Sequence, residues 1–161
     1  MNGLTFFRRG CLTAALFLSL TGISGVSAAL TTAERLTEAE ALARAGSFEA
    51  ALGSLQQTVA DDPQSVVALT KLAGVQTLMG QYSTSVETYR KALAMDDKHA
   101  PAYMGLGIAL LHLGDYAQAW LALDRAESLA PERQKEIQEV KVWLGTKAQA
   151  AMNQAPVHSS R

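Results

Sequence analysis

Histidines and paired acidic residues are the side chains of this sequence whose types and spacing could support chemistry. His99 follows Asp96 and Asp97 closely, and a divalent metal could use an Asp/Asp/His set of ligands. Adjacent short acids are also typical of turns at helix ends, where their carboxylates accept hydrogen bonds from nearby backbone amides. The set offers too few ligands for a metal site, so the turn interpretation is favoured.

Other patterns of catalysis and cofactor binding are missing from the sequence. It has no HExxH, no GxSxG and no glycine loop of the phosphate-binding kind. Gly105 and Gly107 lie within an expected helix, where they would serve close helix packing. The single cysteine, Cys11, lies in a segment that we expect to be removed. We therefore predict a non-enzymatic protein without a metal or cofactor, and an enzyme with a novel site is the weaker alternative.

Charge and composition narrow the class of partner. The chain carries 14 basic and 15 acidic residues, and 48% of its residues are hydrophobic. The basic residues are scattered, so no basic stripe points to a nucleic acid partner. The hydrophobic content is sufficient for a folded core.

The N-terminal segment has the layout of an export signal. Arg8 and Arg9 precede a stretch without charges, which ends in the small residues of 26–29. This order predicts a secretory signal peptide over residues 1–29, and hence a periplasmic or secreted protein. The alternative is an uncleaved anchor in the inner membrane, with the rest of the chain in the periplasm, since the stretch is long enough to span a bilayer. The sequence does not decide between general secretion and twin-arginine export.

A repeat of 34 residues organises most of the remaining chain. Gly46, Gly80 and Gly114 are spaced by 34, and each is followed two residues later by an aromatic residue. A small residue and then a large one follow at fixed offsets in each cycle: Ala51 and Leu55, Ser85 and Tyr89, Ala119 and Leu123. The glycine permits a backbone turn with positive φ, the small residue permits close approach of two helices, and the large residue fills the space beside it.

This period and these positions resemble the tetratricopeptide repeat family, whose pattern is W-x2-L-G-x2-Y, then A-x3-F, then P. The third cycle matches best, through Tyr103, Leu106, Gly107, Leu110, Ala119, Leu123 and Pro131. The resemblance implies an all-α fold of three helix-turn-helix repeats in a right-handed α-solenoid. We expect repeats over 32–65, 66–99 and 100–133, with helices at about 32–45, 48–60, 65–79, 83–95, 99–113 and 117–129.

The residues after the third repeat read as a cap. Ile137, Val140 and Leu144 fall in the register of the first helix of a repeat, with polar residues between them. They predict a capping helix over 132–152 that covers the third hairpin. The tail, 153–161, is expected to be disordered. Trp120 and Trp143 are expected to pack where the third repeat meets this cap.

The resemblance also implies a site, because the first helix of each repeat in this family lines a concave face. Helical spacing places on that face Val67, Thr70, Gly74, Leu78, Met104, Ile108, Leu111 and His112. Some members grip a carboxylate terminus there, but the matching positions carry Leu36, Glu40 and Thr70, which excludes that mode.

A mostly apolar groove predicts an adaptor or scaffold of the cell envelope that binds an apolar or amphipathic segment of a protein or peptide. Two alternatives remain open. The groove side chains could be ordinary core, or a second copy could fill the groove of a self-assembling structural protein, which would be a homo-oligomer.

Overall fold

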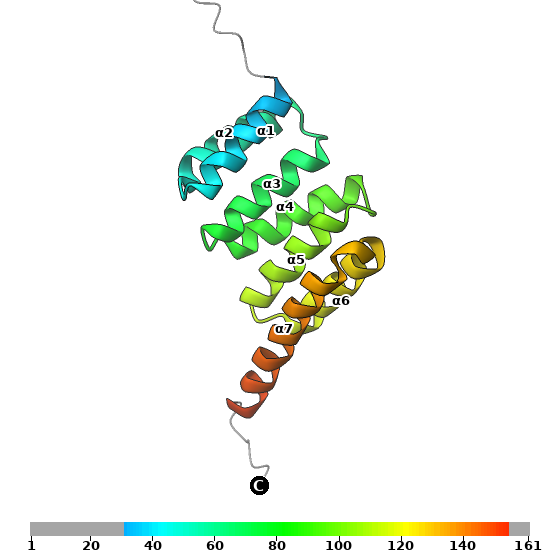
Figure 1. The fold of residues 1–161 in the computed structure, drawn as a ribbon. Helices are drawn as coiled ribbons and strands as arrows, with labels where there is room; N and C mark the ends of the chain where they lie inside the picture. Colours follow the sequence, from blue (N-terminus) through cyan, green and yellow to red (C-terminus); the bar gives the residue numbers. More distant parts are fainter. Residues whose placement is uncertain (1–30, 155–161) are drawn as a thin grey trace, which may run out of the picture.

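The computed structural model describes residues 31–154, and within this range the chain forms an all-α array without strands (Figure 1). The predicted signal peptide lies outside the described residues. The helices are α1 (Thr32–Arg44), α2 (Phe48–Asp61), α3 (Val66–Leu78), α4 (Tyr82–Met95), α5 (Ala100–His112), α6 (Tyr116–Leu129) and α7 (Gln134–Gln154), with a short 3-10 turn at Pro131–Arg133 before α7. All six helices of the repeats begin and end within about one residue of the predicted bounds.

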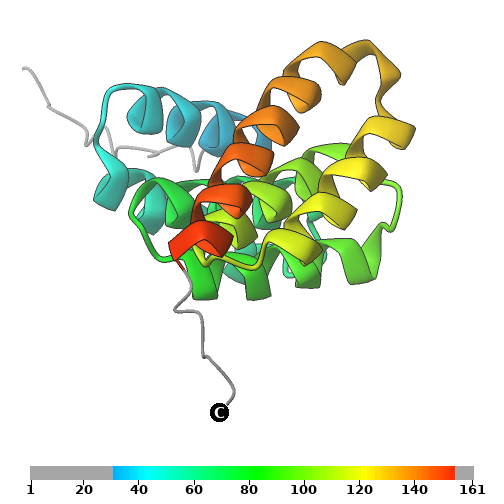
Figure 2. The same cartoon turned by 90° about the horizontal axis from the view of Figure 1, so that it is seen from below.

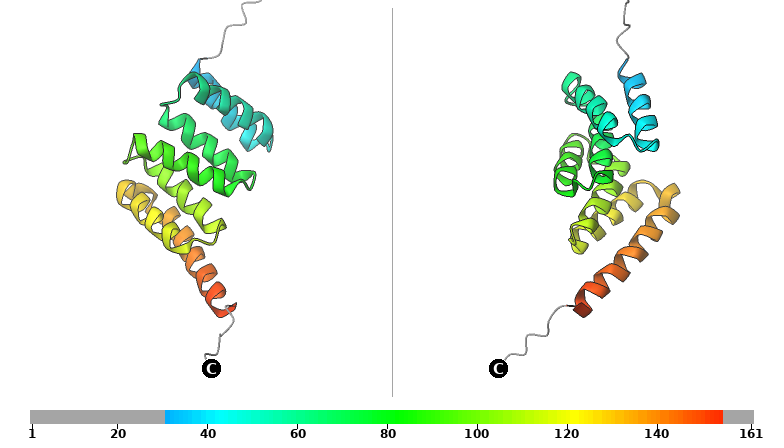
Figure 3. Two further views of the ribbon diagram at one scale, coloured as in Figure 1. Left: turned by 180° about the vertical axis from the view of Figure 1, so that it is seen from behind. Right: turned by 90° about the vertical axis from the view of Figure 1, so that its left-hand side faces the viewer.

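The helices pair into three hairpins that stack in one direction. Each helix packs against the next one in the chain, and α1, α3, α5 and α7 also contact one another in series. Figures 2 and 3 show α1 and α7 on the same side of the array. The surface that α1, α3, α5 and α7 present away from α2, α4 and α6 is called the first-helix face below.

The three glycines of the repeat make the turns of the hairpins. Gly46, Gly80 and Gly114 have φ values of 78°, 74° and 79°. A side chain is strained at positive φ, so glycine is the residue that lets each first helix stop and the second begin. The near-identity of the three angles explains why the hairpins repeat one geometry.

The helix ends follow the expected local chemistry. Thr31 accepts a hydrogen bond from the Glu34 backbone N–H at 3.3 Å, and the Glu34 carboxylate accepts one from the Thr31 N–H at 2.8 Å. This is the predicted capping box. Asp62 and Asp96 accept bonds from amides two residues later, at 3.2 and 2.9 Å, as the turn interpretation requires.

Small residues bring the helices of each hairpin together. Ala51 and Ala119 are fully buried, and so is Leu123. A Cβ added at Gly107 would lie 2.7 Å from the Leu123 Cγ and 3.2 Å from the Ala119 carbonyl oxygen. Glycine at 107 is therefore set by close packing, as the sequence indicated.

Helix α7 occupies the place of a fourth first helix but differs from the others in two ways. It continues for 21 residues where the other first helices have 13, because Ala148 stands where a turn glycine would fall. It also carries Lys141 at the position held by Ala39, Ala73 and Gly107 in the three repeats. Ile137 and Leu144 are buried as predicted, with exposures of 1% and 3%.

Helix α7 continues two residues past the end predicted for the cap. The helix runs through Asn153 and Gln154, because no glycine or proline interrupts it before Pro156. Residues 155–161 lie outside the described range. Within residues 31–154, no helix is both long enough and apolar enough to cross a membrane.

Candidate functional site

An apolar pocket of about 170 Å³ opens between α1 and α3. It is called the α1–α3 pocket below, and its lining is Ala39, Glu40, Ala43, Leu55, Lys71, Gly74, Val75 and Leu78. Buried Leu55 comes from α2, whereas Leu78 is 60% exposed at the end of α3. Gly74 and Leu78 both belong to the predicted groove. The pocket therefore offers an apolar surface that no described residue covers completely.

A single ion pair supplies the charge at this pocket. The Lys71 ammonium contacts the Glu40 carboxylate, joining α1 to α3. Burial lowers the pKa of Lys71 from its usual value of 10.5. Because each charge of the pair is balanced by the other, the pocket does not select a charged ligand by itself.

A second pocket, of about 290 Å³, lies between α5, the start of α6, and α7. It is called the α5–α7 pocket, and it is lined by Leu111, His112, Tyr116, Trp143 and Lys147. The His112 ring stacks on Tyr82 of α4, with ring centroids 4.4 Å apart and planes 1° from parallel. The Trp143 ring is tilted toward His112 at 6.1 Å. The first contact joins the third hairpin to the second, and the other joins it to α7.

The other predicted groove residues differ in accessibility. Val67 is 44% exposed, whereas Thr70 is half-buried and its hydroxyl donates to the Val66 carbonyl oxygen at 2.7 Å. Met104 and Ile108 are half-buried, and Met104 packs against the core. Leu111 is only 5% exposed and belongs to the core cluster, so its prediction as an open groove residue needs correction. The arrival of α7 beside α5 is the physical reason.

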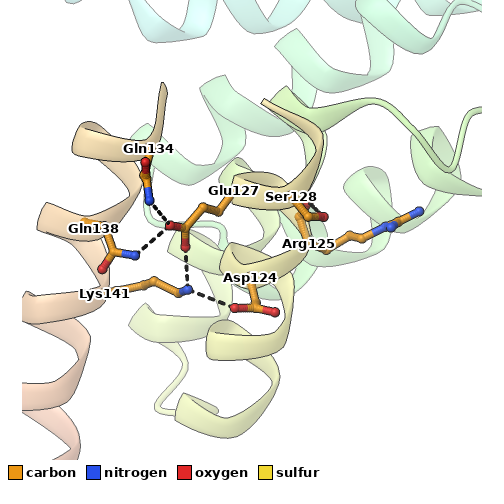
Figure 4. Close-up of polar contacts among 7 residues, drawn as sticks. All are labelled: Asp124, Arg125, Glu127, Ser128, Gln134, Gln138 and Lys141. Carbon is orange, nitrogen blue, oxygen red and sulfur yellow. Dashed lines mark hydrogen bonds and ion pairs between the residues drawn. The ribbon is translucent and has the colours of Figure 1, made fainter. Parts of the chain in front are cut away.

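A buried lysine forms a polar cluster between α6 and α7, which the sequence analysis missed (Figure 4). The Lys141 ammonium donates to Glu127 Oε2 at 2.7 Å and to Asp124 Oδ1 at 3.0 Å. Gln134 and Gln138 donate to the other oxygen of Glu127 at 3.0 and 2.7 Å. The signal that could have revealed it was a lysine at the position that is small in every repeat.

Hydrogen bonding stabilises the charges of this cluster. The bonds from Lys141, Gln138 and Gln134 lower the pKa of Glu127 from 4.5 to about 2. Burial opposes the charge of Lys141, but the bonds to Glu127 and Asp124 outweigh it, so the pKa of Lys141 is raised. The cluster therefore ties α7 to α6 through charged groups at neutral pH.

The two tryptophans at the junction of the third repeat and α7 are only partly covered. Trp120 is 45% exposed and lies under the Lys141 ammonium, 4.9 Å from the ring centroid. Trp143 is 43% exposed, with the Lys147 ammonium 5.4 Å from its ring centroid. Both rings contact α7 lysines or third-repeat residues, as expected for the junction, but each keeps an open side.

The hairpin-end acids make local contacts. His99 Nδ1 lies 3.9 Å from Asp96 Oδ2, while the other Asp96 oxygen accepts the Lys98 N–H. Within the described part of the chain, no three histidine, cysteine or acidic side chains lie close enough together to hold a metal ion.

Three hairpins of one geometry, stacked with contacts only between successive neighbours, define a helical-repeat solenoid. The family model described as "Tetratricopeptide repeat" matches residues 79–133, and the sequence resemblance is thereby supported independently. Residues 79–133 therefore match this family, and the described chain has the fold of its repeat arrays.

Curated relatives match part of this chain. The BBSome complex member BBS4 homolog of Drosophila melanogaster is 33% identical over 87 residues, which are 54% of this chain and 18% of that protein. Superkiller complex protein 3 of Mus musculus is 32% identical over 78 residues, 48% of this chain and 5% of that protein. The chain therefore corresponds to less than a fifth of the length of these relatives.

Solved structures share the fold. The first TPR domain of human RPAP3 superposes with a TM-score of 0.71 at 17% identity, covering 77% of this chain and 96% of that one. The yeast Sti1 TPR2B domain, solved in a pHsp70 complex, superposes with a TM-score of 0.68 at 16% identity. The match covers 72% of this chain and 97% of that one. The Yersinia enterocolitica chaperone SycD, solved with a peptide of the translocator YopD, superposes with a TM-score of 0.64 at 21% identity. The match covers 71% of this chain and 92% of that one.

Proposed function

We propose that this chain is a non-enzymatic adaptor or scaffold of the cell envelope, which binds an apolar or amphipathic segment of another protein on its first-helix face. The observation that carries the proposal is the α1–α3 pocket, where a leucine that is 60% exposed stands beside an uncovered apolar surface. An apolar surface of this kind gains free energy when a partner removes it from water.

Proteins of the same fold support this mode of action. Sti1 and SycD were solved with pHsp70 and a YopD peptide, and each shares the fold at low sequence identity. The partner proposed for this chain differs in chemistry from a carboxylate terminus, because Leu36, Glu40 and Thr70 stand where such a terminus would need basic or amide side chains.

Two leucines of similar exposure give a matched test. Leu78 is 60% exposed at the α1–α3 pocket, and Leu121 is 69% exposed on α6. Leu78→Asp and Leu121→Asp should both fold, because surface substitutions usually change stability by less than about 0.5 kcal/mol. We expect Leu78→Asp to lose partners that the wild-type chain retains from the envelope fraction, since an unpaired carboxylate would have to be desolvated against an apolar ligand.

Leu121→Asp should retain those partners. Equal retention by the two variants would refute binding at the α1–α3 pocket. If the wild-type chain sediments as a homo-oligomer that Leu78→Asp alone dissociates, the pocket is filled by a second copy, and the self-assembling alternative replaces the adaptor.

The envelope location rests on the sequence of residues 1–29. N-terminal sequencing of the protein from its native cells should give a chain that begins at about residue 29 or 30. A chain that begins at Met1 and stays with the membrane after a salt wash would support the anchored form, with the repeats in the periplasm. Cytosolic recovery of the full-length chain would contradict both.

A further inference from the structure

The α5–α7 pocket combines aromatic walls with one cation. Trp143 and Tyr116 line it, together with the exposed ring of His112, whose stacking on Tyr82 holds it in place. None of its lining residues carries a carboxylate. The pocket therefore presents a positive charge beside flat apolar surface.

Lys147 differs from the other lysines that face the pockets or the cap. Lys71 is paired with Glu40, and Lys141 is paired with Asp124 and Glu127. None of the ion pairs within residues 31–154 involves Lys147, and its ammonium lies over the Trp143 ring. A cation at an aromatic pocket without a counter-charge is electrostatically complementary to an anionic group.

The repeat places the two pockets in sequence along the first-helix face. Leu78 and His112 are 34 residues apart, so they hold equivalent positions at the ends of α3 and α5. These two helices contact each other, and the pockets flank them, one toward α1 and the other toward α7. A segment lying across α3 and α5 would therefore meet both pockets.

We propose that the α5–α7 pocket binds an aspartate or glutamate side chain of the same segment whose apolar residue fills the α1–α3 pocket. This inference rests on the proposed function and specifies its ligand. The Lys147 ammonium supplies the charge, while Trp143 and Tyr116 cover the methylene groups beside the carboxylate. We propose a side chain and not a carboxylate terminus, because Leu36, Glu40 and Thr70 stand where a terminus would need basic or amide side chains. Helix α7 is then part of the binding site as well as a cap.

A random peptide library tests this assignment. Twelve-residue peptides, joined to phage by their C-termini so that no free carboxylate terminus is offered, would be selected on the full-length protein. We expect the wild type to enrich an apolar residue together with Asp or Glu at a preferred spacing. Lys147→Gln should keep the apolar enrichment and lose the acidic one. Lys135→Gln, at an exposed lysine of α7 outside both pockets, is the control and should behave as wild type.

The affinity for one selected peptide measures how much its acidic side chain contributes to binding. Replacing its acidic residue by the amide should weaken binding to the wild type by about two- to fivefold at low salt, the range of a partly exposed ion pair, and should leave Lys147→Gln unchanged. Acidic enrichment that persists in Lys147→Gln, or a wild-type selection without it, would overturn the inference while leaving the adaptor in place. A selection without apolar enrichment, or one that Leu78→Asp reproduces, would reject the adaptor itself.

Discussion

Replacing Gly107 by alanine tests whether helix packing in the third hairpin is as close as the structure indicates. The new Cβ would lie 2.7 Å from the Leu123 Cγ, well inside the ordinary carbon–carbon contact of about 3.5–4.0 Å. Leu123 is fully buried and the Ala119 carbonyl belongs to the backbone of α6, so neither can withdraw easily. Overpacking of this kind costs about 1–3 kcal/mol.

Alanine also favours a helix over glycine by about 0.8–1.0 kcal/mol, which offsets part of this cost. Gly53 in the middle of α2 separates the two effects, because a Cβ there would meet no atom within 4 Å. Gly53→Ala should therefore stabilise the protein by about 0.8–1.0 kcal/mol. We expect Gly107→Ala to be less stable than Gly53→Ala by about 1–3 kcal/mol.

Urea unfolding followed by far-UV circular dichroism measures this difference. Thermal melts of the two variants should separate by at least about 2 °C, since 1 kcal/mol shifts the melting temperature by about 2–8 °C in domains of this size range. If the two alanine variants have equal free energies of unfolding, the α5–α6 crossing is looser than described and the reasoning from the Gly107 contact is refuted.

Three further predictions concern the junctions that hold the array together. Ala119→Leu should destabilise by about 1–3 kcal/mol in urea unfolding, because a fully buried alanine leaves no room for a larger side chain; unchanged stability would contradict the packing. Lys141→Met should lower stability by about 1–3 kcal/mol, since its side chain is buried and its part-buried hydrogen bonds are charge-assisted, whereas Lys135→Met should not. The folded state depresses the pKa of Glu127 from 4.5 to about 2, so its contribution is complete above pH 4.5 and is lost as the pH falls toward 2. The free energy of unfolding, measured at a series of pH values, should fall over this range in the wild type and fall less in Glu127→Gln. If the free energies of the two proteins change in parallel with pH, the cluster does not stabilise the fold.

Most of the fold could be predicted because the geometry of each hairpin depends on residues that lie close together in the sequence. A glycine with positive φ, a small residue and a large one recur every 34 residues, and each has one structural reason for its place. The capping box at Thr31 and Glu34 could be predicted for the same reason, because it depends only on residues within one turn.

The site was less predictable because it depends on how distant elements meet. Helical spacing assigned Gly74 and Leu78 to a concave face, and both line the α1–α3 pocket, but it treated the buried Leu111 as open. The burial of Leu111 and the aromatic pocket around His112 both depend on where α7 lies. The position of α7 cannot be predicted from the residue pattern of a single helix. The pairing of Lys141 with α6 was missed because polar residues of the cap were all assigned to its solvent side.

Lys141 and Ala148 mark the place where the series of hairpins ends within the described residues. In each repeat, a residue no larger than alanine allows the second helix to close on the first, and a glycine then reverses the chain. In α7 both residues differ. Lys141, a long charged side chain, replaces the small residue, and Ala148 replaces the turn glycine, so the helix continues. A small contact residue and a turn glycine are therefore both missing from α7, and within residues 31–154 the series of hairpins ends there. Exchanging Lys141 and Ala148 for alanine and glycine would be the starting point for building a longer array from this chain.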